Sequence, residues 1–443
     1  MSKHRRDLVI YAVSSSSRKE GKGGKIFIRV GYGLRALFLV LLLYLFSGSF
    51  CQREDEESLP FQVISNTPGN SFCPEIAITP DGIIHVVWAD SDVVTGDWRI
   101  MYSWREISAR DWSEPEVIYD RGHAAWPTLR MDSLGNLHLL YGDWEPGTLF
   151  YACKPFGGEW GDLEVLPERT WLWYAQCDRE NRFHLIYEPF SGGIVYHYLI
   201  RNPDGSWEGP YELPARADNL RFVIDDEGKV HLVEGGGSIF YSYGDRDGWS
   251  VSEMIYGSAS AEWPDIALSR DGRLVVTWHD PRFHCGFGTY NIAYMVKEDT
   301  SWSSVDTFPM CGKPRLDRIF FHGSDLYLLW WKIEGSTADL YWSVWDGNEF
   351  ETHRIETPYF SRNPDGVIRD GRLYLVWIEE MEPKNFEVVF RVENVKWSEK
   401  EGEMNACKNF LFIHLAPSSP EREVKEEGVF VFLKTGKERR ERW

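Results

Sequence analysis

The sequence repeats one phrase seven times, and this repetition constrains the fold more than any other feature. The first copy, Ile76–Asp90 (IAITPDGIIHVVWAD), has a short apolar run, an Asp-Gly turn and a longer alternating run. Asp-Gly favours a tight hairpin because Gly accepts positive φ without steric cost. The further copies are Leu129–Asp143, Cys177–Glu188, Val223–Glu234, Ile266–Asp280, Arg318–Lys332 and Val367–Glu379.

Two aromatic landmarks follow each copy. A third strand is marked by Tyr102, Tyr151, Tyr196, Tyr241, Tyr294, Tyr341 and Phe390. A second aromatic comes next, at Trp112, Trp160, Trp207, Trp249, Trp302, Phe350 and Trp397, with spacings of 48, 47, 42, 53, 48 and 47 residues. A period in the forties that holds four short strands is typical of a β-propeller blade. The chain is therefore predicted to be all-β, a seven-bladed β-propeller.

The seventh copy lacks an outer strand, because Trp397 is followed by a charged stretch. Leu59–Ser65 (LPFQVIS), ahead of the first copy, has the character of the missing strand. We expect it to complete the last blade, which would leave no exposed sheet edge. The predicted propeller spans residues 59–400, and 401–443 form a C-terminal extension, either a hairpin with a basic tail or a partly ordered tail.

The first 49 residues read as a signal segment, followed by a charged tether over 50–58. Ala36–Phe46 is an eleven-residue apolar run, short for a bilayer span but suited to a secretory signal. Cys51 resembles the modified cysteine of bacterial lipoproteins, although Phe50 stands where a small residue is usual. A cleaved signal, a lipid anchor and an uncleaved membrane anchor all place the propeller outside the cytoplasm.

Charge and cysteine content narrow the function classes. The net charge of −20 disfavours nucleic-acid binding, since an acidic surface repels phosphates. The six cysteines other than Cys51 allow zero to three disulfides, and most are expected to be buried small residues. We expect a monomer that contacts a membrane only through its leader or a lipid anchor.

The second-strand acids Asp90, Asp143, Asp280 and Glu379 would stand around the channel mouth. They could bind a structural cation such as calcium or supply a carboxylate pair, but their regular recurrence favours capping of their own loops. Histidines recur at His85, His138, His184 and His231. They stand on successive blades, and other residue types occupy the same place in other copies, so we expect them to pack rather than bind metal.

Ligand-binding candidates gather in the loops of the mouth, where rigid scaffolds carry function. Trp126 and Trp263 each precede a Pro before an innermost strand, with Trp144, Trp171 and Trp173 nearby. Their faces could stack on sugar rings or cover the blade interior. The least regular loop, His279–Tyr290, carries Asp280, Arg282, His284 and Tyr290, and Arg362 could join them. It is either a binding loop or an ordinary surface loop.

A phrase complete in Asp81–Pro115 carries a family resemblance: Asp-Gly-x-apolar-His-apolar-apolar-Trp-x-Asp, then Tyr-Ser, then Trp-Ser-x-Pro. It resembles the BNR-repeat, sialidase-like propellers of secreted bacterial proteins. No intact Asp-box occurs, sialidases have six blades, and the Arg-Ile-Pro motif of their first arginine is absent. The resemblance therefore implies an architecture rather than an activity.

Three functions remain open. The first is a secreted or surface-tethered propeller that binds carbohydrate or another extracellular ligand at the channel mouth, without a cofactor. The second is a sialidase-like glycoside hydrolase, with Asp280, Arg282 and Glu379 as the groups to test. The third is a scaffold for protein–protein interaction.

Overall fold

The computed structural model describes residues 61–395, apart from 93–94, 121–122, 144–146, 190–194, 214–216, 218, 287, 299, 336, 358 and 383–384. Within these ranges the regular elements are the strands β1 to β28, and no helix there is long and apolar enough to cross a bilayer. The leader, Cys51, Trp144, Trp397 and the C-terminal extension lie outside the described residues.

The strands form five antiparallel sheets. One contains β2 (Asn70–Ile78), β3 (Ile83–Ser91), β4 (Trp98–Glu106) and β5 (Glu116–Tyr119). The seven-stranded sheet contains β6 (Ala124–Met131), β7 (Leu137–Asp143), β8 (Thr148–Lys154), β9 (Glu164–Cys177), β10 (Phe183–Pro189), β11 (His197–Arg201) and β12 (Trp207–Glu212). The nine-stranded sheet contains β13 (Asn219–Ile224), β14 (Val230–Gly235), β15 (Gly237–Asp245), β16 (Gly248–Trp249), β17 (Glu253–Leu268), β18 (Leu274–Gly286), β19 (Thr289–Glu298), β20 (Ser301–Trp302) and β21 (Asp306–Gly312).

The two remaining sheets have four strands each. One contains β22 (Pro314–His322), β23 (Asp325–Glu334), β24 (Thr337–Trp345) and β25 (Phe350–Ile355). The other contains β26 (Ser361–Arg369), β27 (Arg372–Glu382), β28 (Asn385–Asn394) and β1 (Gln62–Val63). In this last sheet Gln62 pairs with Phe390 and Val63 with Val389, which confirms the expected pairing of the N-terminal strand with the strand of Phe390.

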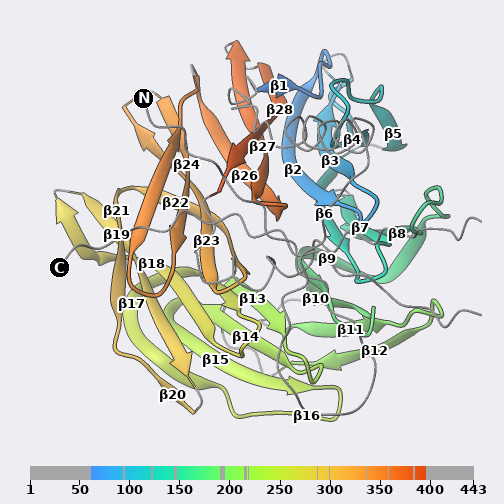
Figure 1. Cartoon of the computed structure of the whole chain (residues 1–443). Helices are drawn as coiled ribbons and strands as arrows, with labels where there is room; N and C mark the ends of the chain where they lie inside the picture. The colour runs from blue at the N-terminus through green and yellow to red at the C-terminus, as the bar shows by residue number, and fades with distance from the viewer. Residues whose placement is uncertain are drawn as a thin grey trace, which may run out of the picture. The chain divides into compact units, whose positions relative to one another are not determined.

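The two larger sheets each divide at a long strand. The first half of β9 pairs with β8 and its second half, from Thr170, pairs with β10. In the same way β17 pairs with β15 up to Ala261 and with β18 from Glu262. The described residues thus contain seven successive strand groups, which we number by their innermost strands β2, β6, β9, β13, β17, β22 and β26, and which follow one another around a common centre (Figure 1).

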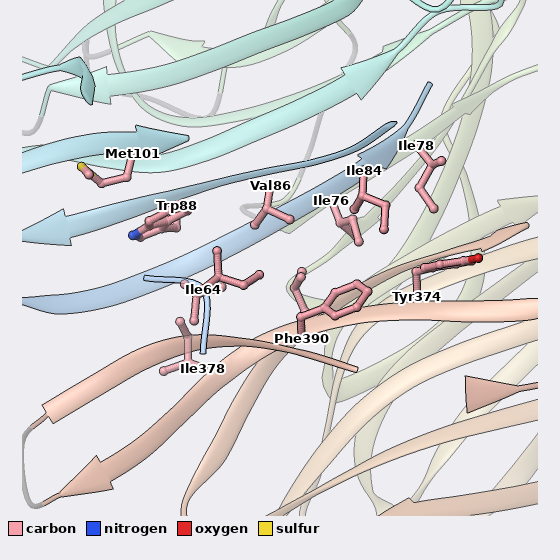
Figure 2. Close-up of a cluster of buried hydrophobic side chains, with 12 residues drawn as sticks. Ile64, Ile76, Ile78, Ile84, Val86, Trp88, Met101, Tyr374, Ile378 and Phe390 are labelled. Carbon is pink, nitrogen blue, oxygen red and sulfur yellow. The ribbon is translucent and has the colours of Figure 1, made fainter. Parts of the chain in front are cut away.

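The hydrophobic core of the described residues lies between neighbouring groups. Successive residues of a strand point to opposite faces, so Val86 packs toward group seven and Val87 toward group two. Figure 2 shows the cluster between groups one and seven, to which Ile76 and Trp88 of group one and Tyr374 and Phe390 of group seven belong. Comparable clusters join every other neighbouring pair of groups. A second strand such as β3 is buried on both sides, so its apolar residues are nearly continuous.

The repeated aromatics pack between neighbouring groups. Trp112 of group one meets Phe390 of group seven edge-on at 5.2 Å between ring centroids, and Trp160 meets Tyr102 at 5.5 Å. Two landmarks were assigned wrongly. In group six Trp342, which pairs with Leu329, is the equivalent of Tyr102, and Tyr341 faces the other side of its strand. In group three Tyr198, which pairs with Ile186, is the equivalent of Tyr102, and Trp249 packs edge-on against it rather than against Tyr196.

Candidate functional site

A central cavity of about 680 Å³ is lined by the innermost strands of all seven groups. Trp126, at the start of β6, lines this cavity and is still 41% exposed. The cavity is therefore open toward the starts of the innermost strands, and we call that rim the mouth. When the seven groups are aligned by the pairing of their first two strands, one lining residue of each innermost strand falls at an equivalent position. These seven residues are Glu75, Thr128, Tyr174, Arg221, Asp265, Arg318 and Asp365.

The carboxylates at this position link each group to the next. Asp365 Oδ2 accepts a hydrogen bond from the N–H of Ile76 at 3.0 Å, and Asp265 Oδ2 accepts one from Ile319 at 3.1 Å. Those N–H groups belong to the neighbouring innermost strand. Burial raises the pKa of Asp265, while Arg221 beside it lowers the pKa. The acids thus satisfy backbone donors that would otherwise lie unpaired at the centre.

The cavity arginines already have bonding partners. Arg130 forms an ion pair with Glu75 at 2.6 Å and donates to the carbonyl of Ala175. Arg318 forms an ion pair with Asp365. Arg221 donates to the carbonyl of Leu220 and lies over the ring of Tyr174, 4.3 Å from its centroid. Sequence reasoning missed this set of charges, although the repeated Pro-acid pairs before Ile76 and Ile266 gave a signal.

Asp317 differs from the other cavity acids. It is the extra residue of a bulge in β22, where four other groups have a Pro. Burial raises the pKa of Asp317 to about 7, although Trp331 and Arg221 act to lower it. A carboxyl group that titrates near neutrality on a cavity wall can donate or accept a proton, or bind a hydroxyl.

Four residues at the mouth share an unusual backbone, and all of them except Trp263 line the cavity. Trp126, Trp263, Cys73 and Asn363 each precede a Pro and have φ of 49°, 48°, 50° and 53°. This left-handed conformation costs a non-Gly residue about 1–2 kcal/mol. It belongs to the bulge that starts the innermost strand in these groups. Two of the four positions carry a Trp, and both are more than 40% exposed.

Trp263 forms part of a cluster at the mouth. The Arg315 guanidinium lies over its ring, 4.0 Å from the centroid, and His279 meets it edge-on. Burial, with a further contribution from Arg315, lowers the pKa of His279 to about 3, so the imidazole is neutral. Arg362 lies over the rings of Phe386 and Phe72, at 4.6 and 5.3 Å. Trp173 is buried and meets Trp126 edge-on.

The four second-strand acids do not line the cavity. Asp90, Asp280 and Glu379 are completely buried, and each accepts a hydrogen bond from a serine hydroxyl, that of Ser71, Ser258 and Ser361 respectively. Asp143 accepts one from the hydroxyl of Tyr119. Their role in the described structure is to fix loops, mainly through side-chain hydroxyls. Asp280 also accepts the backbone N–H of Arg282 in its own loop at 2.9 Å, as the predicted capping requires.

The irregular loop extends as a hairpin of β18 and β19. Arg282 bonds Asp280 at 3.0 Å and the Tyr256 hydroxyl at 2.5 Å, while its side chain stays half exposed. The Arg282 bonds lower the pKa of Asp280 against the opposing effect of burial. His284 is exposed and pairs with Tyr290 across the hairpin. Glu379 lies on β27, in another sheet, so these three catalytic candidates do not form one constellation.

A disulfide between Cys285 and Cys311 ties this hairpin to β21. Both cysteines are exposed, and Cys73, Cys153 and Cys177 are half-buried free thiols. The expectation that most cysteines are buried small residues was therefore wrong for the five that are described. Spacing gave no hint of the pairing, since strands distant in sequence bring the two thiols together.

The recurring histidines bridge two strands and a turn. His85 Nδ1 and the Tyr102 hydroxyl lie 2.7 Å apart, and Nε2 lies 3.1 Å from the Thr79 hydroxyl. The same histidine–tyrosine contact recurs at His138–Tyr151, His184–Tyr198 and His231–Tyr241. Over the described ranges, no three His, Cys, Asp or Glu side chains are placed so that they could hold a metal ion.

Comparison with known proteins supports the fold. No protein-family model and no curated protein sequence matches the chain. An ulvan lyase of polysaccharide lyase family PL25 is similar in structure, with a TM-score of 0.53 and 11% identity over 75% of this chain and 96% of that chain. The fold is of the β-propeller type.

Two further solved structures are more distant. A protein of unknown function from Dyadobacter fermentans has a TM-score of 0.49 and 11% identity, over 76% of this chain and 99% of its own. The NanB sialidase of Streptococcus pneumoniae has a TM-score of 0.43 and 11% identity, over 76% of this propeller-type chain and 71% of its own. At such identities the likeness concerns the fold alone.

Proposed function

We propose that this chain is a secreted or surface-tethered seven-bladed β-propeller that binds carbohydrate at the mouth of its central cavity. The observation that carries the proposal is the pair of exposed tryptophans, Trp126 and Trp263, at equivalent positions of the mouth. An indole offers a flat apolar face with a polar edge, which suits a sugar ring. The seven strand groups, joined by β1, would be the blades of a closed ring.

The structural neighbour supports this choice of ligand class. One ulvan lyase structure is bound to -[GlcA(1-4)Rha3S]- and has a TM-score of 0.52 to this chain at 11% identity. A propeller of this type can therefore hold a carbohydrate. The exposed disulfide supports a location outside the cytoplasm, because such bonds persist in oxidising compartments.

Glycan-array binding of the purified full chain tests the proposal. Trp126→Ala and Trp263→Ala should each weaken retention of the bound glycan about fivefold, on the order of 1 kcal/mol for one stacked ring. Trp104→Ala is the matched control, since Trp104 is 43% exposed on β4 and does not line the cavity. If no glycan is retained, or if Trp104→Ala has the same effect, the proposed site is wrong.

A sialidase-like glycoside hydrolase is the second candidate, and one observation favours it. Arg130, Arg221, Arg318 and Tyr174 line one cavity together with several carboxylates, among them Asp317. Asp317 could act as a proton donor at neutral pH. A panel of fluorogenic glycosides tests this reading. Hydrolysis that Tyr174→Phe and Asp317→Asn abolish would support it, and glycan retention without hydrolysis would leave the binding function.

A further inference from the structure

Arg315 is distinguished by its lack of bonding partners. Within the described ranges its guanidinium forms neither a hydrogen bond nor an ion pair with another side chain, and it lies instead over the indole of Trp263 at 4.0 Å. Arg315 itself is half-buried at the mouth. A guanidinium carries five N–H donors in a planar fork. Most of these donors are left for something other than the protein.

The arginines deeper in the cavity, unlike Arg315, already donate to acceptors of the protein. Arg130 and Arg318 are held by Glu75 and Asp365, and Arg221 bonds a backbone carbonyl. A ligand anion that approached them would have to compete with those partners. The guanidinium whose donors are available to an anion is therefore that of Arg315, at the rim of the cavity and not at its centre.

A second arginine repeats the arrangement in the next group. Arg315 and Arg362 each stand three residues before an equivalent cavity residue, Arg318 and Asp365. Arg362 also lies over aromatic rings, and no described carboxylate forms an ion pair with it. Two adjacent groups thus present a stacked, uncompensated guanidinium at the same level of the mouth. In a chain of net charge −20, such a positive rim stands out against its surroundings.

The neighbouring acids do not neutralise this rim. Asp317 is the cavity acid nearest to Arg315 in the chain, and Arg315 helps to lower its pKa without forming an ion pair with it. Glu262 is exposed beside Trp263 and forms no ion pair with either arginine in the described part of the chain. The donors of Arg315 therefore point to an external anion. A planar fork suits a carboxylate or a sulfate, both of which it can bind through two parallel bonds.

We propose that Arg315 forms a subsite for the anionic substituent of an acidic sugar, which is a ring carboxylate or a sulfate ester. Arg315 is stacked on Trp263 in this subsite, and Arg362 adds a second positive charge. This inference rests on the proposed carbohydrate-binding function and names its ligand class. The sugar ring lies against the exposed part of the Trp263 indole, and the anionic group receives N–H donors from Arg315. Neutral glycans would use the tryptophans alone.

An array of neutral glycans printed beside their sulfated and uronate counterparts tests the subsite on the full chain. The wild type should retain acidic members above their neutral counterparts. Arg315→Gln should lower affinity for the best acidic glycan about tenfold to a hundredfold, the loss expected for a charge-assisted bond pair, and should leave neutral glycans unchanged. Arg246→Gln is the control, since Arg246 is a half-exposed surface arginine paired with Glu208 outside the cavity lining.

The outcomes separate the two proposals. Equal retention of neutral and acidic glycans, or unchanged acidic affinity in Arg315→Gln, overturns the subsite and leaves the carbohydrate function standing. No retention of any glycan overturns both. An equal loss in Arg246→Gln would mean that general charge attracts the glycan, which also overturns the subsite. Melting temperatures show whether each variant is folded. The affinity of the wild type for the acidic glycan should fall as the NaCl concentration rises, and Arg315→Gln should lose this salt dependence.

Discussion

Replacing Asp365 by alanine removes two interactions at the centre of the fold at once. The Asp365 carboxylate accepts the N–H of Ile76 at 3.0 Å and forms the ion pair with Arg318. Asp365 is only 6% exposed. The variant would leave a buried N–H without an acceptor and a guanidinium without its carboxylate. Both changes fall where groups six, seven and one meet.

The magnitude follows from these two losses. An unsatisfied buried N–H costs about 1–3 kcal/mol, and breaking a buried ion pair from one side costs about 3–5 kcal/mol. The Arg318 side chain is 34% exposed to the cavity, and Glu75 and Asp265 also stabilise its charge. The lower end of each range therefore applies, and the two losses together should lower the free energy of unfolding of Asp365→Ala by about 4 kcal/mol.

Urea unfolding followed by tryptophan fluorescence measures this loss as a lower midpoint at unchanged slope. The double variant Asp365→Leu/Arg318→Met should lose less than Asp365→Ala, because it buries no unpaired charge. Asp226→Ala is the control for an exposed pair, since Asp226 and Arg179 are 54% and 60% exposed, and it should change stability by less than about 0.5 kcal/mol. A loss in Asp365→Ala no larger than this control, or a double variant worse than the single one, would refute the reasoning.

Three further variants probe other features. The pKa of Asp317 is raised to about 7, so between about pH 4 and 7 the native state holds a proton that the unfolded chain has released. Stability should therefore fall as pH rises from about 4 to 7. Asp317→Asn should flatten this fall in melting curves recorded at different pH values, and an unchanged slope would contradict the assignment. Gly142→Ala would place a Cβ 2.4 Å from the Trp173 ring and should cost about 1–3 kcal/mol of unfolding free energy, whereas Gly248→Ala, with open space around it, should not. Cys285→Ser removes a disulfide that spans 26 residues and should lower the free energy of unfolding by about 3 kcal/mol. A reducing agent should lower the melting temperature of the wild type but not that of this variant.

Local sequence signals determined the strand groups. Asp-Gly and related pairs place a residue with positive φ at each hairpin, for example Gly82 at 86° and Gly272 at 88°. Alternation along each strand sends neighbouring residues to opposite faces, so the apolar repeat alone indicates sheets buried on both sides. The pairing of Gln62 with Phe390 could also be anticipated, because one repeat lacked a strand and the chain offered one elsewhere.

The site was decided by tertiary structure. The seven equivalent cavity residues are of several types, so no repeated letter marks them, and their charges meet only because the innermost strands converge. The recurring acids looked alike in sequence, yet Asp90 and Asp280 are buried and bonded to serine hydroxyls, so they are not accessible to a ligand. Arg315 resembles any other surface arginine until the fold sets it on Trp263. Local chemistry determines which strands form, whereas the bonding partners of a charged group depend on residues distant in sequence that only the tertiary structure brings near.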